Sequence, residues 1–301
     1  MQNDEPKSAM DATPTLVAPH PFDDSDGDLI LRTSDKVDFH VHRAILRLSS
    51  SVFASMLSFP QPPSQADGLS NNVIDVSDDS KVLYQVLSWI DPRGTLRLGD
   101  LDEVAAILTC AEKYDLETVK NRLMEFGYAG RESLKQNPIA LFALGQRFRH
   151  QDMADFGAKG SLQIAIMDWP DTPLLDRITG RDYQALVHYY LHCQKAAKSV
   201  VKDWLQWSSS RDCIWRTPWS LHHCTFRTYE GVNYPEWWIQ YLEAIGRALW
   251  ETPSPHVTST IDIISVTAPA SLCGKCKPKY VADLQSFNDL LVERLDVMLP
   301  K

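Results

Sequence analysis

The sequence predicts an α+β domain in the first half of the chain and a mainly helical region after it. Two short apolar runs, within 26–33 and 37–40, are close enough in sequence to pair as a hairpin. Directly after them the apolar spacing changes from two residues to three and four, which indicates helices. Long helical patterns without further strand signals then fill most of the chain after residue 137.

The helices of the α+β domain begin with two short ones, predicted over 42–48 and 51–58. Ile45, Leu48, Val52 and Met56 follow helical spacing, whereas the serine run 49–51, where the second helix begins, fits a helix start better than a helix interior. A third strand and three further helices are predicted, in chain order, over 73–76, 82–90, 101–111 and 116–126. Three short strands with five helices define a small α+β domain over 26–127.

Composition limits the classes of function. The chain has 301 residues, 44% hydrophobic and 23% charged, as is ordinary for a globular protein, and a net charge of -9 argues against binding nucleic-acid phosphates. The N-terminus lacks the pattern of a secretory signal, and no apolar run reaches membrane-spanning length. Six cysteines in such a chain indicate reduced thiols or metal ligands. We therefore expect a cytoplasmic or nuclear protein without membrane or nucleic-acid partners.

Three further segments complete the predicted organisation. Residues 1–25 contain four prolines and few large apolar residues, so a disordered tail that is dispensable for folding is expected. A helical extension is predicted over 128–210, and a helical region rich in tryptophan and cysteine over 211–301, with its last helix at 281–298. Seven of the nine tryptophans lie in the last third of the chain: Trp204, Trp207, Trp215, Trp219, Trp237, Trp238 and Trp250. Core filling is the favoured interpretation of these tryptophans, and a ligand surface is the alternative.

The first domain resembles the BTB/POZ family. The resemblance rests on an ordered set of motifs: Asp28-Leu29-Ile30-Leu31, Phe39-His40-Val41-His42-Arg43-Ala44-Ile45-Leu46, Ile74-Asp75-Val76, Leu87-Ser88-Trp89-Ile90 and Ala111-Glu112-Lys113-Tyr114-Asp115-Leu116. The segment after it, with Ala140-Leu141-Phe142-Ala143-Leu144 and Thr179-Gly180-Arg181-Asp182-Tyr183, is similar to the helical extension of fungal, basidiomycete-like BTB proteins.

The resemblance implies a non-catalytic protein-interaction module that forms a homodimer and recruits a partner. The implied self-association surface lies near Ile30, Ile45, Leu48 and Phe53. Two more specific roles are open: a substrate adaptor that binds a cullin scaffold of a ubiquitin ligase, and a nuclear scaffold or transcriptional co-regulator. Residues 59–72 lack the hydrophobic-x-Glu element of many cullin adaptors, and no DNA-binding module is evident.

An enzyme is not expected. His40 and His42 lie near Asp38 and near serines, but they occupy framework positions of the resemblance, so a structural role is favoured over catalysis. The sequence contains neither a nucleophile-elbow motif nor a dinucleotide or phosphate loop.

Cys273-Gly274-Lys275-Cys276 is the sharpest chemical signal, because two cysteines at this spacing can grip one tetrahedral metal ion from a tight turn that Gly274 permits. Cys213 and Cys224 are the predicted remaining ligands of a structural zinc site, with His222 and His223 as substitutes. An ordinary turn before a helix, with free thiols, is the slightly favoured interpretation, and the zinc site is the alternative to it. Lys275, Lys277 and Lys279 beside the cysteines are interpreted as a solvated basic turn, because the chain is acidic overall, and a nucleic-acid contact is the alternative.

Overall fold

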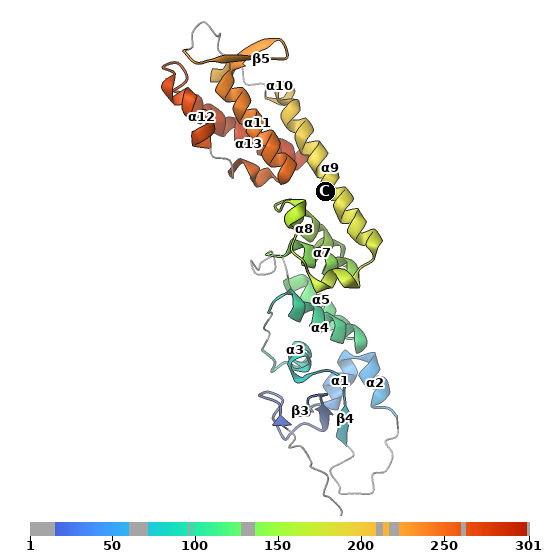
Figure 1. The fold of residues 1–301 in the computed structure, drawn as a ribbon. Helices are drawn as coiled ribbons and strands as arrows, with labels where there is room; N and C mark the ends of the chain where they lie inside the picture. Colours follow the sequence, from blue (N-terminus) through green and yellow to red (C-terminus); the bar gives the residue numbers. More distant parts are fainter. Residues whose placement is uncertain are drawn as a thin grey trace, which may run out of the picture. The chain divides into compact units, whose positions relative to one another are not determined.

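The computed structural model describes residues 16–59, 72–95, 97, 99–127, 136–208, 213–216, 223–259 and 263–299. The chain divides into two compact units, residues 1–133 and residues 134–301 (Figure 1). Both predicted parts of the fold class are confirmed: an α+β unit with short strands, followed by a mostly helical region. Among the described helices, none is both long and apolar enough to cross a membrane.

The first unit is built on a four-stranded sheet with the strand order β1-β3-β2-β4. The predicted hairpin is present, since β2 and β3 pair antiparallel with Leu31 opposite Phe39, and β4 joins the other edge of β2 in parallel. Across the hairpin Arg32 binds Asp38, with 2.7 Å between Nε and Oδ1. The strands span Leu16–Val17 (β1), Leu29–Arg32 (β2), Val37–Val41 (β3) and Val73–Asp75 (β4).

The prediction that the first 25 residues form a disordered tail is wrong for residues 16–25. Strand β1 pairs in parallel with β3, and the Ala18 N–H donates to the Asp38 carbonyl at 2.9 Å. Phe22 is fully buried, with ring centroids 5.8 Å from Phe39 and 5.5 Å from Tyr84. The composition did not indicate this contribution to the fold, because a two-residue strand and one aromatic ring hardly change the mean hydropathy of a proline-rich segment. Residues 1–15 lie outside the described part of the chain.

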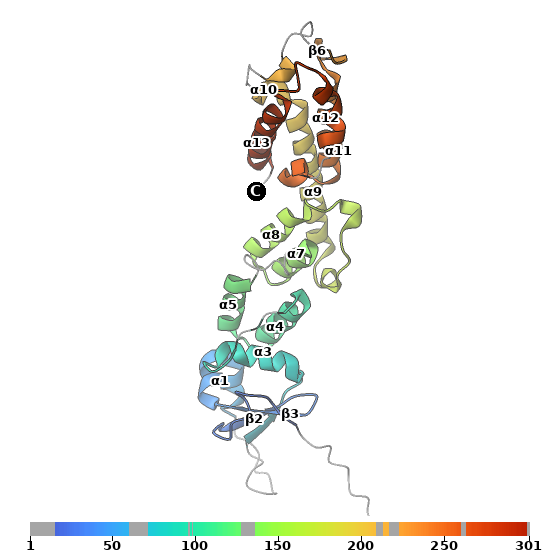
Figure 2. The same ribbon diagram turned by 90° about the vertical axis from the view of Figure 1, so that its left-hand side faces the viewer.

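The described helices of the first unit lie on one side of this sheet (Figure 2). Ser50 separates the first two, as the serine run indicated: its N–H closes α1 on the Leu46 carbonyl, and its hydroxyl caps α2 by accepting the Phe53 N–H at 2.9 Å. Asp79 and Asp100 cap α3 and α4 in the same way. The helices span Arg43–Ser49 (α1), Ser51–Met56 (α2), Ser80–Ile90 (α3), Leu101–Lys113 (α4) and Glu117–Gly127 (α5).

The second unit starts with a closely packed helix pair, α7 (Pro138–Arg147) and α8 (Gln151–Ser161). The close approach requires glycine: a Cβ built on Gly145 would lie 2.4 Å from the Ala154 nitrogen, and one on Gly157 would lie 2.4 Å from the Phe142 nitrogen. Helix α9 (Gly180–Lys202) follows and begins with a capping box of Thr179 and Asp182.

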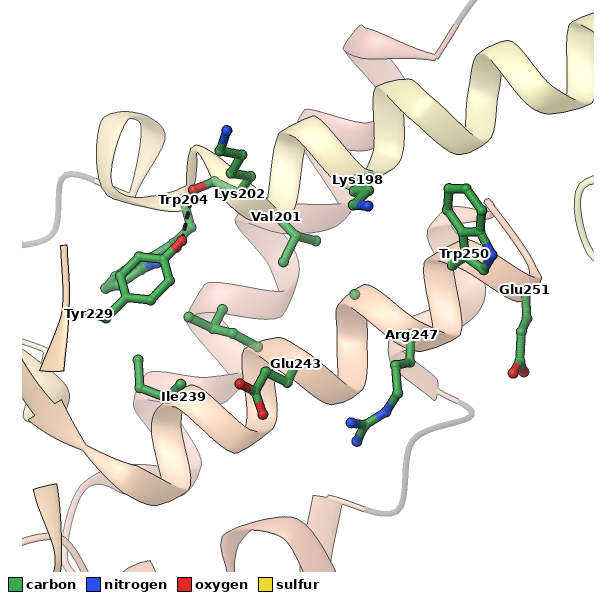
Figure 3. A pocket seen from close by; sticks show the side chains of 12 residues that line it. Lys198, Val201, Lys202, Trp204, Tyr229, Ile239, Glu243, Arg247, Trp250 and Glu251 are labelled. Atoms are coloured by element: carbon green, nitrogen blue, oxygen red, sulfur yellow. Dashed lines mark hydrogen bonds between the residues drawn. The ribbon is translucent and has the colours of Figure 1, made fainter. Parts of the chain in front are cut away.

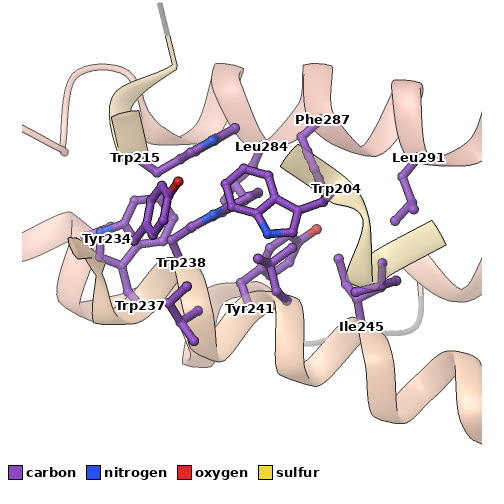
Figure 4. Close-up of a cluster of buried hydrophobic side chains, with 14 of the residues drawn as sticks. Trp204, Trp215, Tyr234, Trp237, Trp238, Tyr241, Ile245, Leu284, Phe287 and Leu291 are labelled. Atoms are coloured by element: carbon purple, nitrogen blue, oxygen red, sulfur yellow. The ribbon is translucent and has the colours of Figure 1, made fainter. Parts of the chain in front are cut away.

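The C-terminal part of α9 packs with α11 and α13, and these helices enclose a core of aromatic side chains (Figure 4). Trp215 and Trp238 stack in parallel with ring centroids 3.9 Å apart, and Trp204 meets Trp238 edge-on at 5.2 Å. The remaining bounds are Trp204–Trp207 (α10), Phe226–Tyr229 (β5), Val232–Pro235 (β6), Glu236–Glu251 (α11), Ile263–Leu272 (α12) and Tyr280–Met298 (α13).

The core-filling interpretation is confirmed for four of the seven tryptophans of this region, Trp204, Trp215, Trp237 and Trp238, which are fully buried. Trp207 is half-buried and stacks on Phe287 at 5.2 Å. Trp250 is an exception, because 49% of it is exposed, and Trp219 lies outside the described residues.

Candidate functional site

Three cysteines from distant parts of the sequence meet in the second unit. Cys273 and Cys276 lie in the turn between α12 and α13, and Cys224 lies just before β5. All three Sγ atoms are within 4.8 Å of one another, and Cys224 Sγ is 3.9 Å from Cys276 Sγ. A disulfide would require about 2.05 Å. Two sulfurs bound to one tetrahedral zinc at about 2.3 Å lie about 3.8 Å apart, so the observed spacing fits a shared metal ion.

Helix-like hydrogen bonds hold the turn that carries Cys273 and Cys276. The Lys277 N–H donates to the Cys273 carbonyl at 2.9 Å, and the Tyr280 N–H donates to the Cys276 carbonyl at 3.0 Å, which leads the chain directly into α13. Both cysteine side chains are buried as a result. The expected role of Gly274 is wrong, because Gly274 has no left-handed φ and a Cβ added there would meet nothing within 4 Å.

The three thiols have different electrostatic surroundings. Burial alone would raise the pKa of Cys273, but hydrogen bonds from the backbone N–H groups of His223, Cys276 and Lys275 outweigh it and lower the pKa to about 6. Burial raises the pKa of Cys276, and the neighbouring sulfurs raise it further. Burial also raises the pKa of Cys224. The cluster therefore favours one thiolate, at Cys273, beside two thiols.

The other predicted ligands are not part of this cluster. Cys213 packs against the same aromatic core, but its sulfur does not join the other three. The side chain of His223 is exposed, and this residue contributes its backbone N–H instead. His222 lies outside the described residues. Three of the four predicted cysteine ligands therefore lie together in the structure. The spacing of Cys213 and Cys224 along the sequence did not indicate how far apart they lie in space.

The residues predicted for self-association differ in burial. Leu48 on α1 is 89% exposed, and Ile30 and Ile45 are half-buried. The expectation that Phe53 lies on the surface is wrong, because Phe53 is buried and stacks on Tyr114, with 4.6 Å between the ring centroids. Core and interface positions carry the same apolar side chains, so the sequence did not separate Phe53 from Leu48.

The two histidines considered for catalysis belong to the framework of the first unit. His40 is paired within the β2–β3 hairpin, and His42 is the residue that precedes α1. The carboxylate of Asp38 binds Arg32 through two hydrogen bonds, of 2.7 and 2.8 Å, so it does not orient a histidine. Arg93 lowers the pKa of Asp91, and the nearby His42 adds a smaller contribution.

An apolar groove of about 490 Å³ lies between α9 and α11 in the second unit (Figure 3). Val201, Ile239, Leu242 and Gly246 form its apolar surface, and a Cβ built on Gly246 would meet nothing within 4 Å. The other lining residues are Lys198, Lys202, Trp204, Tyr229, Glu243, Arg247, Trp250 and Glu251. Sequence reasoning missed this groove, and a glycine inside a tryptophan-rich helix was the available signal.

The comparison with protein families matches the BTB/POZ domain to residues 23–128. The chain therefore contains a BTB/POZ domain, a class of domain that points to protein–protein interaction and is generally non-catalytic. The comparison with curated proteins finds no match for the chain. The fungal type and the similarity of the segment after residue 127 to a fungal BTB extension stay predictions.

Proposed function

We propose that this chain is a non-catalytic interaction protein that forms a homodimer through its BTB/POZ domain and recruits a partner protein with its helical second unit. The match to residues 23–128 carries the proposal, because domains of this class bind proteins. The more specific part of the proposal is self-association, and the surface of α1 supports it.

Leu48 is the main support for self-association. Exposed single leucines are common, but Leu48 follows the half-buried Ile45 at a spacing of three, so both lie on the same side of α1. Burial of a leucine side chain stabilises an association by about 1.5–3 kcal/mol, and a symmetric dimer buries two of them.

Leu48→Glu in the full chain tests this assignment. Because Leu48 is 89% exposed, the variant should fold normally, but its carboxylate should oppose burial against a second copy. We expect wild type to have the mass of a dimer in light scattering at tens of micromolar (about 6–7 kcal/mol of association free energy) and Leu48→Glu to be largely monomeric.

Met167→Glu is the matched control, since Met167 is 91% exposed and belongs to the second unit. It should remain dimeric. A monomeric wild type at the same concentration would contradict self-association, and a dimeric Leu48→Glu would contradict the assignment of α1.

Recruitment is supported by the groove between α9 and α11. Its floor is apolar, and Lys198 and Lys202 on α9 line its rim. Neither lysine forms an ion pair with a residue that the structure describes. Glu243 on the opposite helix is paired with Arg227 at 2.9 Å. The occupant that fits is therefore an amphipathic helix of the partner with a carboxylate beside the two lysines.

The identity of the partner separates the more specific roles. A cullin scaffold as the partner would make the chain a substrate adaptor of a ubiquitin ligase, and a nuclear regulatory complex would make it a scaffold or co-regulator. A pull-down with purified cullin and a salt-dependent DNA-binding measurement distinguish the two. Binding to the cullin supports the role of substrate adaptor. DNA binding that weakens steeply with salt would instead indicate direct contact with DNA phosphates and favour the nuclear role.

A further inference from the structure

We propose that Cys224, Cys273 and Cys276 bind one structural zinc ion, which fastens the segment before β5 to the turn between α12 and α13. The proposal concerns the second unit and is independent of the role of the BTB/POZ domain. The ligand set is three sulfurs and one nitrogen or oxygen, because Cys110, Cys193 and Cys213, the remaining cysteines, all lie outside the cluster.

The positions of the sulfur atoms are the first support. The Cys224–Cys276 pair, with 3.9 Å between the Sγ atoms, matches one edge of a tetrahedron around zinc and is too far apart for a disulfide, and all three Sγ atoms lie within 4.8 Å of one another. Cys273 and Cys276 come from one turn and Cys224 from another segment, as in structural zinc sites that join two chain segments.

The N–H groups around the sulfurs are the second, independent support. Backbone N–H groups of His223, Lys275 and Cys276 point at the Cys273 sulfur. The indole N–H of Trp237 is buried, lacks a hydrogen-bond partner within ordinary geometry among the described residues, and lies beside the Cys276 sulfur. Donors of this kind stabilise anionic sulfur and accompany metal-bound thiolates as an outer shell.

The chemistry of the ligands favours a divalent cation. A divalent ion between three sulfurs at this spacing would offset the repulsion among the thiolates that bind it. Soft thiolate ligands in tetrahedral geometry select zinc over magnesium or calcium. Burial of Cys273 and Cys276 restricts access to the ion, which fits a structural role.

Metal analysis of the full chain, purified without chelator, tests the proposal. We expect about one zinc per chain in wild type, the stoichiometry of a single tetrahedral site, and less than a tenth of that in Cys276→Ala and Cys224→Ala. Cys193→Ala is the matched control, since Cys193 and Cys276 are both 0% exposed and belong to the same unit. It should retain zinc, and so should Cys213→Ser. Metal-free wild type, or loss of zinc from Cys213→Ser, would overturn the proposed ligand set.

A second measurement avoids variants that fail to fold. Wild type is stripped with a chelator under reducing conditions and titrated with Co²⁺. We expect saturation at one equivalent, the intense visible bands of tetrahedral cobalt, and sulfur-to-cobalt charge transfer of the strength of three thiolates. Zinc should displace the cobalt and raise the thermal midpoint of the second unit. Absence of these bands, or a disulfide between Cys224 and Cys276 in the untreated protein, would overturn the proposal.

Discussion

At the scale of single residues, Phe22 shows how one side chain gives a structural role to a segment whose composition suggested none. Its ring is fully buried between Phe39 of β3 and Tyr84 of α3. The Tyr84 hydroxyl also donates to the His20 carbonyl at 3.0 Å. The segment before β2 is therefore fastened to the sheet and to the helices at the same point, and its removal would expose both.

We expect Phe22→Ala to destabilise the first unit by about 3–5 kcal/mol, because it removes a buried ring and leaves a cavity. Urea unfolding followed by far-UV circular dichroism measures the change. Asp23→Ala, at the neighbouring exposed position, should change stability by less than about 0.5 kcal/mol. A Phe22→Ala midpoint equal to that of Asp23→Ala would show that the segment contributes no stability.

At the scale of elements, α11 combines a buried aromatic face with a glycine that opens the groove. Trp237, Trp238 and Tyr241 point into the core, whereas Gly246 lies in the groove wall. Glycine inside a helix is unfavourable relative to alanine, so a glycine at this position costs stability while it keeps the groove wide.

Gly246→Ala should stabilise the second unit by about 0.5–1 kcal/mol and leave partner binding nearly unchanged. Gly246→Leu should fold equally well, because nothing lies within 4 Å of the added Cβ, but its side chain should fill the groove. Quantitative affinity purification of the three proteins measures the effect: the partner should be retained by wild type and by the alanine variant and reduced several-fold with leucine. Equal recovery with all three would exclude the groove as the recruitment site.

At the scale of the whole molecule, the two compact units differ in what holds them together. The first closes a sheet with helices over apolar side chains such as Phe39 and Leu108. The second depends on aromatic packing and, by the zinc proposal, on an ion that joins segments far apart in sequence. Binding free energy of such an ion is part of the folding free energy of its unit.

Chelation should therefore act on one unit only. With a zinc chelator, we expect amide hydrogen exchange to accelerate in 223–259 and 263–299, while the amides of β2, β3 and α4 keep their protection. The same chelator added to Cys276→Ala serves as the control and should cause no further change. Equal exchange with and without chelator in wild type would contradict a structural ion, and faster exchange in both units would show that the chelator acts elsewhere.

The sequence by itself determined what depends on local pattern. Apolar spacing gave the β2–β3 hairpin, the two short helices separated by Ser50 and the helical second unit, because period and capping are properties of neighbouring residues. An ordered set of motifs was enough to indicate the BTB/POZ domain that the family comparison then matched to residues 23–128. The same reasoning singled out the C-x2-C turn.

Tertiary structure alone decided which residues meet. It buried Phe53 and left Leu48 exposed, although both are apolar helix residues close in sequence. It brought Cys224 to Cys276 and kept Cys213 out of the cluster, although Cys213 and Cys224 pack against the same aromatic core. Separation in space is determined by the sum of many weak contacts across the unit, and no single stretch of sequence contains that sum.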